Sequence, residues 1–304
     1  MLDLVHFSSN MVYIPVVETQ RMIFFQEVTK RGGIVLIHQP QCSFMNMIGL
    51  LPELADEPNP VVFEEIDASK VERAARNLHG AGGPTLVDAD GWRRLLCSKA
   101  YGNASLNLCQ AVADLAKKMC TEKIHPDSLI EYVACRLIPL NKGDDKFGNP
   151  GVRPIGIGEI LRRLVGKVVV GNVRKDVIEA AGPLQTCVGL KAGIEASIHA
   201  MREIYEEDST EAVLLVDAEN AFNNLNRRAA LHNIKQLCPV FHRYLENTYQ
   251  LPAKMIINDN TGQCDDIVSE EGTTQGDVPA MAMYAIGTKP LLDKLLAVVN
   301  NDIC

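Results

Sequence analysis

An aspartate follows a short apolar run in the last third of the chain. Residues 213–216 read Val-Leu-Leu-Val, and Asp217 comes next, ahead of Ala218 and Glu219. A buried strand that ends in an acid can aim a carboxylate rigidly at a hard cation such as Mg²⁺. The other interpretation is a helix N-cap, in which the carboxylate accepts hydrogen bonds from the free amides of the helix that follows. The residue types leave both interpretations open.

A second candidate is a loop of small and polar residues before an apolar helix. Residues 269–277 read Ser-Glu-Glu-Gly-Thr-Thr-Gln-Gly-Asp. Glycine lets the backbone approach a ligand closely, so the segment favours a binding loop. Its outline is like a nucleophile elbow, but Gln275 stands where that chemistry needs a serine. The loop therefore predicts binding and not acyl transfer.

Two cations flank a polar, glycine-rich stretch in the middle of the chain. Lys142 follows the apolar run 137–140, and Arg153 precedes Pro154. An arginine presents a fork of donors to phosphate oxygens and a lysine presents a point charge, so the two could hold a triphosphate. Taken separately, each of them is better explained by simple surface solvation.

Charge is unevenly distributed along the sequence. Residues 141–175 contain three acids (Asp144, Asp145, Glu159) and eight bases, a local balance of 8 − 3 = +5, whereas residues 203–219 are rich in acids. The bases are Lys142, Lys146, Arg153, Arg162, Arg163, Lys167, Arg174 and Lys175. Such a pattern suits an enzyme that holds both phosphates and metal ions, although two solvated helix faces would give the same pattern.

Composition limits the class of protein. The chain has 304 residues, of which 47% are hydrophobic and 22% charged, with a formal net charge of −8 that argues mildly against a general nucleic-acid binder. No apolar run is long enough to cross a membrane, and no basic region precedes an apolar one at the N-terminus. Nine cysteines without a C-x-x-C pair favour reduced, mostly buried thiols over a disulfide framework or a zinc site. We expect an intracellular protein, cytoplasmic or nuclear, with no membrane partner.

Periodicity and turn residues predict the elements that would position these candidates. Apolar residues recur every three or four positions in residues 105–120, which is typical of an amphipathic helix. Similar reasoning predicts strands at 137–140, 212–216, 254–258 and 267–270, a polar loop at 141–151, a hairpin turn at 259–262, and further helices at 68–77, 88–99, 129–135, 159–179, 192–206, 220–236 and 278–296. Residues 1–58 carry no recognisable chemistry.

Taken in order, these segments resemble the reverse transcriptase domain of retrotransposons, closest to the type without long terminal repeats. Arg153-Pro154-Ile155 and the basic helix behind it resemble the fingers motif of that family. Residues 217–222 resemble its metal-binding A motif, and residues 271–277, centred on Gln-Gly-Asp, resemble its B motif. Residues 83–92 are similar to the segment upstream of the fingers. The resemblance covers about residue 59 to the end, and three ordered motifs carry it.

The resemblance implies roles at the reacting centre. Asp217 would bind both catalytic Mg²⁺ ions with help from the Ala218 carbonyl, and Phe222 would be the steric gate that rejects a ribose 2′-hydroxyl. The reaction would be attack of a primer 3′-hydroxyl on the α-phosphate of a deoxynucleoside triphosphate, with two metals bridging the attacking and leaving oxygens.

The resemblance also implies binding residues around that centre. Lys142 and Arg153 would hold the incoming triphosphate. Gln275 and Gly276 would shape the floor of the pocket and contact the template or the nucleotide. The RNA template and DNA primer would be held by the basic helix, through Arg162, Arg163 and Lys167.

The implied fold is α+β, the fingers and partial palm of a right-hand polymerase, mainly helical with a small antiparallel sheet and without the thumb. Residues 1–58 would be an N-terminal extension, 59–211 the upstream helices and fingers, and 212–304 the partial palm. The family's Tyr-x-Asp-Asp turn would come just after Cys304, so the strand at 213–216 is expected to expose an apolar edge. Residues 264–266, Cys-Asp-Asp, are interpreted as part of a hairpin turn.

Two functions remain open at this point. The first is an RNA-directed DNA polymerase fragment of a retroelement that is inactive alone, because one metal-binding carboxylate cannot fix two ions. The second is a domesticated, non-catalytic remnant that binds nucleic acid or protein.

Overall fold

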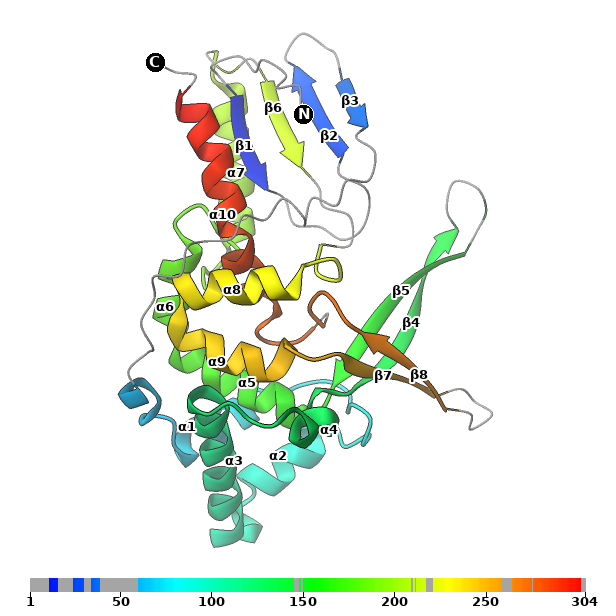
Figure 1. Cartoon of the computed structure of the whole chain (residues 1–304), viewed down its shortest axis with the longest axis vertical. Coiled ribbons are helices and arrows are strands. Elements are labelled where there is room, and N and C mark those ends of the chain that lie inside the picture. Colours follow the sequence, from blue (N-terminus) through cyan, green and yellow to red (C-terminus); the bar gives the residue numbers. More distant parts are fainter. Residues whose placement is uncertain are drawn as a thin grey trace.

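The computed structural model describes residues 11–15, 24–29, 34–38, 60–144, 148, 150–208, 210, 212–216, 221–258, 264–274 and 276–301. Helices make up most of this part, and two separate four-stranded sheets accompany them (Figure 1). The α+β class is therefore confirmed. The single small antiparallel sheet that we expected is wrong, since each of the two sheets contains one parallel pair of strands.

Side-chain caps mark where some of the helices begin. Asp88 caps α2 by accepting from the amide of Gly91, and Asn226 caps α8 by accepting from that of Ala229. The helical elements are η2 (Pro60–Phe63), α1 (Ala68–Arg76), α2 (Ala89–Cys97), η3 (Lys99–Tyr101), α3 (Asn103–Thr121), η4 (Pro126–Leu129), α4 (Ile130–Val133), α5 (Ile160–Asn172), α6 (Arg174–Ala181), α7 (Gly193–Glu206), α8 (Arg227–Leu237), α9 (Pro239–Tyr249) and α10 (Ala280–Asn301).

Three helix predictions need correction. Within the helix expected over 129–135, α4 covers only Ile130–Val133, and Cys135 already begins a strand. The helix expected over 159–179 is divided into α5 and α6, because the backbone leaves the helical conformation at Val173. The helix expected from residue 220 starts only at Arg227, where Asn226 supplies the cap. No described helix is long and apolar enough to pass through a membrane.

One sheet is built from two hairpins, and its strand order is β5-β4-β7-β8. Strands β4 (Cys135–Asp144) and β5 (Pro150–Gly158) form a long hairpin that projects from the helical body (Figure 1). Strands β7 (Ala253–Asn258) and β8 (Cys264–Ser269) form the second hairpin. The loop predicted at 141–151 is thus mostly strand, and residues 264–266 are strand and not turn. The predicted turn at 259–262 lies outside the described residues.

The other sheet surrounds the strand that leads to Asp217. Strand β6 (Ala212–Val216) pairs in parallel with β1 (Met11–Pro15) and antiparallel with β2 (Phe24–Thr29), which also pairs with β3 (Ile34–His38). The order is β1-β6-β2-β3. The expected apolar edge at residues 213–216 is therefore wrong, because strands from the first 58 residues satisfy the backbone of β6 on both sides.

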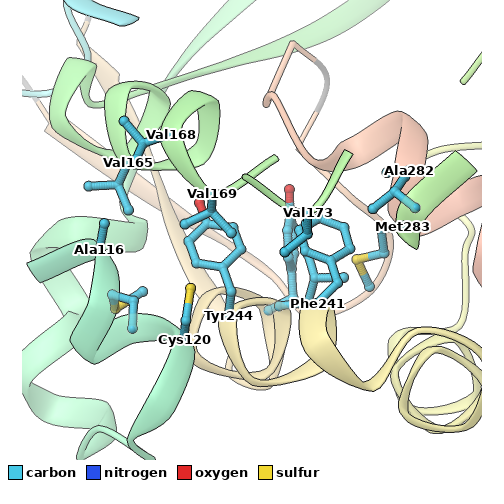
Figure 2. Packing of buried hydrophobic residues seen from close by; sticks show 14 of the residues in the cluster. Ala116, Cys120, Val165, Val168, Val169, Val173, Phe241, Tyr244, Ala282 and Met283 are labelled. Atoms are coloured by element: carbon cyan, nitrogen blue, oxygen red, sulfur yellow. The ribbon is translucent and has the colours of Figure 1, made fainter. Parts of the chain in front are cut away.

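The helical body has one continuous apolar core. Figure 2 shows Ala116 of α3 and Val169 of α5 facing Tyr244 of α9, with Met283 of α10 at the far side. All four side chains are essentially inaccessible to solvent. Burying a large apolar side chain contributes roughly 1.5–3 kcal/mol. Helix α5 approaches α9 closely at Gly166, where an added Cβ would lie 3.1 Å from the Tyr244 hydroxyl. This core fixes α5 and α9, the two helices that carry the polar network described below.

Candidate functional site

The segment after β6 and the loop before α10 are joined by backbone hydrogen bonds. The Thr273 amide donates to the Phe222 carbonyl at 2.6 Å, and the Gly272 amide donates to the Leu225 carbonyl at 2.8 Å. A Cβ at residue 272 would lie 2.2 Å from the carbonyl oxygen of Asn223, and φ there is +73°, so glycine is required. The A-like and B-like segments of the sequence therefore lie side by side.

The segment that would follow Asp217 is described only from residue 221 onward. The next described helix, α8, begins only at Arg227, and its cap is Asn226. Asp217 itself, Ala218 and Gln275 lie outside the described residues. The described neighbour of Asp217 is Val216, the last residue of β6, so the carboxylate follows directly on a strand as the sequence predicts.

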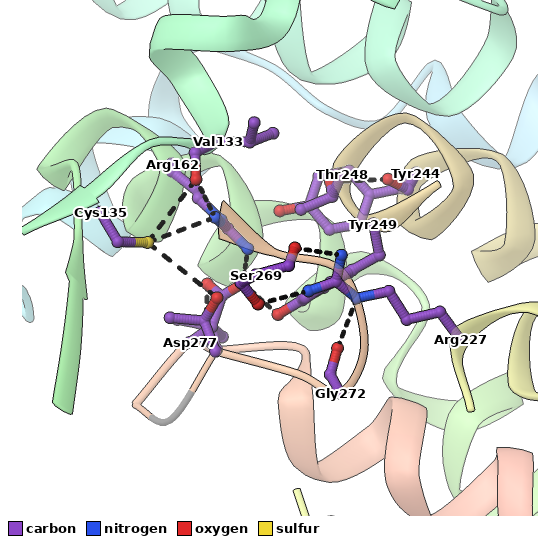
Figure 3. Close-up of polar contacts among 12 residues, drawn as sticks. Val133, Cys135, Arg162, Arg227, Tyr244, Thr248, Tyr249, Ser269, Gly272 and Asp277 are labelled. Carbon is purple, nitrogen blue, oxygen red and sulfur yellow. Dashed lines mark hydrogen bonds and ion pairs between the residues drawn. The ribbon is translucent and has the colours of Figure 1, made fainter. Parts of the chain in front are cut away.

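A buried arginine that the sequence analysis did not identify holds the start of the loop. Arg227 is 5% exposed and uses all of its guanidinium nitrogens. It donates to the carbonyls of Ser269 (3.0 Å), Glu271 (3.1 Å) and Gly272 (2.7 Å), to the Ser269 hydroxyl (2.9 Å) and to the Leu251 carbonyl (3.2 Å) (Figure 3). Because most of these acceptors come from one short segment, Arg227 fixes the path of residues 269–272.

A buried ion pair holds the end of the loop. Arg162 of α5 donates to Asp277 Oδ2 at 2.6 Å, and the two side chains are 1% and 2% exposed. Arg162 also donates to the Val133 carbonyl at 2.9 Å, and the Tyr249 hydroxyl donates to the same Asp277 oxygen at 2.5 Å (Figure 3). Burial is the largest single influence and acts to lower the pKa of Arg162, but the attractions of Asp277, Tyr249 and other neighbours together outweigh it, so the pKa of Arg162 is raised. The expectation that Arg162 contacts nucleic acid does not fit its position inside the protein.

The two other cations predicted on this helix also make internal bonds. Arg163 donates to the carbonyls of His79 and Ala81, and Lys167 donates to that of Asn77. Partial burial lowers the pKa of both side chains. Each is still partly exposed, but the donors that the structure describes tie α5 to the turn after α1. Their predicted contact with a duplex would have to share these donors.

Phe222 and Gly276 differ in their exposure to solvent. The Phe222 ring is half-buried and packs 5.2 Å from the ring of Tyr284 on α10. Gly276 is exposed and has φ of +85°, and a Cβ added there would meet no described atom within 4 Å. Phe222 therefore packs against the helical core, whereas Gly276 faces solvent.

Lys142 and Arg153 are placed through their backbones only. They lie on β4 and β5, and Arg153 pairs with Leu140 across the hairpin. Leu140 and Val152 beside them are about half exposed, at 48% and 53%. Both predicted cations therefore belong to the projecting hairpin and not to the helical body.

A small pocket lies between that hairpin and the loop before α10. Its volume is about 110 Å³, and its lining includes Gly156 and Gly158 of β5, Arg163 of α5, and Thr274 and Gly276 of the loop. A Cβ added at residue 156 would lie 2.7 Å from Cε at the end of the Met255 side chain and 3.1 Å from Thr274 Cγ2, so the strands and the loop pack closely here. The pocket brings the fingers-like and B-like segments to one place.

The buried cysteines in the described part of the chain are poor nucleophiles. Cys109, Cys120, Cys135 and Cys238 are buried and none of the described cysteines forms a disulfide, as the sequence predicts. Burial raises the pKa of these thiols, that of Cys238 to about 12, so they stay protonated at neutral pH.

Comparison with known proteins adds no family. No model of a known protein family matches the chain, and no curated protein is significantly similar to it. Among the described residues, no three side chains of His, Cys, Asp or Glu gather as a metal site would need, but Asp217 is not one of these residues.

Proposed function

We propose that the chain is a reverse transcriptase domain fragment of a retroelement, which binds an RNA template, a DNA primer and a deoxynucleoside triphosphate. The observation that carries the proposal is the meeting of three distant segments. The A-like segment is bonded to the B-like loop through Phe222 and Thr273, and the fingers-like helix is bonded to the same loop through Arg162 and Asp277. Residues that resemble one family in order along the chain also meet in space.

Four of the residues singled out from the sequence then have a part in binding. Gly276, which is exposed, would contact the base or sugar of a ligand, and the half-buried ring of Phe222 would reject a ribose 2′-hydroxyl. Arg153 and Lys142, which lie on the hairpin β4–β5, would hold the phosphates. Arg162 has no place among the residues that contact nucleic acid, because a side chain that is 1% exposed cannot reach a phosphate.

Divalent metal would complete the chemistry. Asp217 and the Ala218 carbonyl would hold Mg²⁺, which offsets the negative charge of the triphosphate and stabilises the leaving oxygen. Two ions need several carboxylates, and the resemblance assigns only Asp217 among these 304 residues.

Duplex binding tests the proposal at the hairpin. A fluorescent oligo(rA)·oligo(dT) duplex should bind weakly at about 50 mM salt and lose most of its affinity by about 200 mM, because phosphate contacts release counterions. Arg153→Glu should weaken binding by roughly fivefold or more. Arg202→Glu, on the exposed surface of α7, changes the net charge equally and should have less than about a twofold effect. Binding that ignores salt, or that both variants weaken equally, contradicts the proposal.

A further inference from the structure

The turn at Gly276 is joined to the rest of the protein by two segments, residues 269–272 before it and Asp277 after it. A buried arginine holds each of these two anchoring segments. Residues 269–272 give three carbonyls and one hydroxyl to Arg227. Asp277, directly after the turn, gives its carboxylate to Arg162. Arg162 and Arg227 are at most 5% exposed. Water therefore cannot replace the hydrogen-bond partners of their guanidiniums without a large cost in free energy. The two anchoring segments are therefore held more rigidly than an ordinary surface loop.

One aromatic side chain contacts both of the arginines that hold these segments. The Cζ atoms of Arg162 and Arg227 lie 5.1 Å and 5.7 Å from the centre of the Tyr249 ring. The negative face of an aromatic ring attracts a guanidinium at such distances. The hydroxyl of the same residue donates to Asp277 at 2.5 Å (Figure 3). Tyr249, the last residue of α9, thus contacts both arginines and the carboxylate.

The hydroxyl of Tyr249 is a permanent donor. Burial raises its pKa well above the usual value, and the neighbouring negative charge of Asp277 adds to the shift. The phenol therefore keeps its proton throughout the neutral pH range. Arg162 and Tyr249 together supply two donors to a single buried oxygen, which fixes Asp277 in one orientation.

The tip of the turn has little support of its own within the described part of the chain. Gly276 is exposed, and no described atom lies within 4 Å of the position that a Cβ would take. The position of Gly276 is consequently set by the two anchoring segments. We propose that Tyr249 is a positioning residue: with Arg162 and Arg227 it forms a clamp that holds the Gly276 turn in place for the incoming nucleotide. This inference rests on the proposed function.

Tyr244 provides a matched control. It lies on the same helix and is equally buried, but it does not take part in the hydrogen bonds that hold Asp277. Tyr244→Phe and Tyr249→Phe remove the same atom from the same helix. Tyr249→Phe removes a hydrogen bond to Asp277 but keeps the ring that contacts the two arginines. Tyr244→Phe removes no hydrogen bond to Asp277.

Amide exchange reports on the turn directly. The Asp277 amide donates to the Thr274 carbonyl and the Val278 amide donates to Asp277 Oδ1, both at 3.1 Å. In Tyr249→Phe we expect these two amides to exchange about tenfold faster relative to the core amides of α5, and in Tyr244→Phe we expect no such local change. The affinity of the chain, bound to a template and primer, for the complementary deoxynucleoside triphosphate should fall about tenfold in Tyr249→Phe alone.

The outcomes separate the clamp from the proposed function. Faster exchange confined to the turn together with weaker nucleotide binding supports the clamp. Equal acceleration of all amides, no acceleration, or a loosened turn with unchanged affinity overturns it. If the unsubstituted chain binds no nucleotide, the proposed function fails and the nucleotide role of the clamp falls with it, whereas the exchange rates still show whether Tyr249 holds the turn.

Discussion

Arg162 and Arg163 are adjacent in the chain but have different surroundings. Successive side chains on a helix point about 100° apart, so Arg162 turns inward to Asp277 while Arg163 reaches the carbonyls of the turn after α1. The basic doublet is typical of a phosphate-binding surface, and the sequence could not show that its counter-charge lies 115 residues away. Arg227 and Tyr249 were missed for the same reason, since their partners come from another part of the chain.

Loss of Arg162 should destabilise the fold. Arg162→Ala leaves the carboxylate of Asp277 buried without its cation, and breaking a buried pair in this way costs about 3–5 kcal/mol. Arg202→Ala, which breaks an exposed pair with Glu206, should cost about 0.5 kcal/mol or less. Urea unfolding monitored by circular dichroism measures both. Equal stability of the two variants would mean that the buried pair does not anchor the loop.

Phe222 should govern the choice of sugar. In a complex with a template and a dideoxy-terminated primer, Phe222→Val opens space beside the turn, so UTP should bind opposite adenine nearly as well as dTTP. The packing of Phe222 against Tyr284 means that the variant also loses some stability, roughly 1–2 kcal/mol. Nucleotide titration should be done well below the unfolding temperature. Unchanged discrimination would make Phe222 a packing residue only.

At the scale of elements, local signals predicted most helices and long-range pairing limited the rest. Periodicity and caps located α1, α2, α3 and α7 to within a few residues. The hairpin β4–β5 was underestimated because its outer residues are polar or glycine, and only pairing across the hairpin makes them strand. The start of α8 was missed because residues 221–226 bond to the loop before α10 instead of forming a first turn.

The N-terminal strands have a structural role that their sequence did not reveal. Apolar runs in residues 11–38 could not indicate their partner, because β6 lies about 200 residues further along. In the fold they flank the strand that delivers Asp217. The stability of the proposed metal-binding end of β6 therefore depends on the first part of the chain.

A proline in β2 should expose β6. Gln26 pairs with Leu215 on one side and with Leu36 on the other, so Gln26→Pro breaks the ladder of a central strand. An unpaired β6 presents an apolar edge, and we expect a lower monomer fraction in size-exclusion chromatography. Gln26→Thr preserves the backbone donor and should remain monomeric to the same extent as the unsubstituted chain. Identical profiles for both variants would show that β2 does not protect β6.

At the scale of the whole molecule, the net charge of −8 does not show where the cations lie. Some are buried, and others lie on the projecting hairpin. Arg162 and Arg227 are enclosed and organise one loop, whereas Arg153 and Lys142 lie on a hairpin that leaves the body. The sequence predicted the approach of the A-like and B-like segments through family resemblance, and the hydrogen bond between Phe222 and Thr273 supports that expectation.

Template-directed nucleotide selection tests the central claim most directly, because it requires the site but not the chemical step. The chain is mixed with an oligo(rA) template, a dideoxy-terminated oligo(dT) primer and Mg²⁺, and dissociation of the labelled primer is timed. We predict that dTTP slows dissociation several-fold more than dCTP, and that Asp217→Asn abolishes the difference. Equal effects of dTTP and dCTP, or the same selection by Asp217→Asn, would contradict a polymerase site and favour a remnant that binds nucleic acid without reading it.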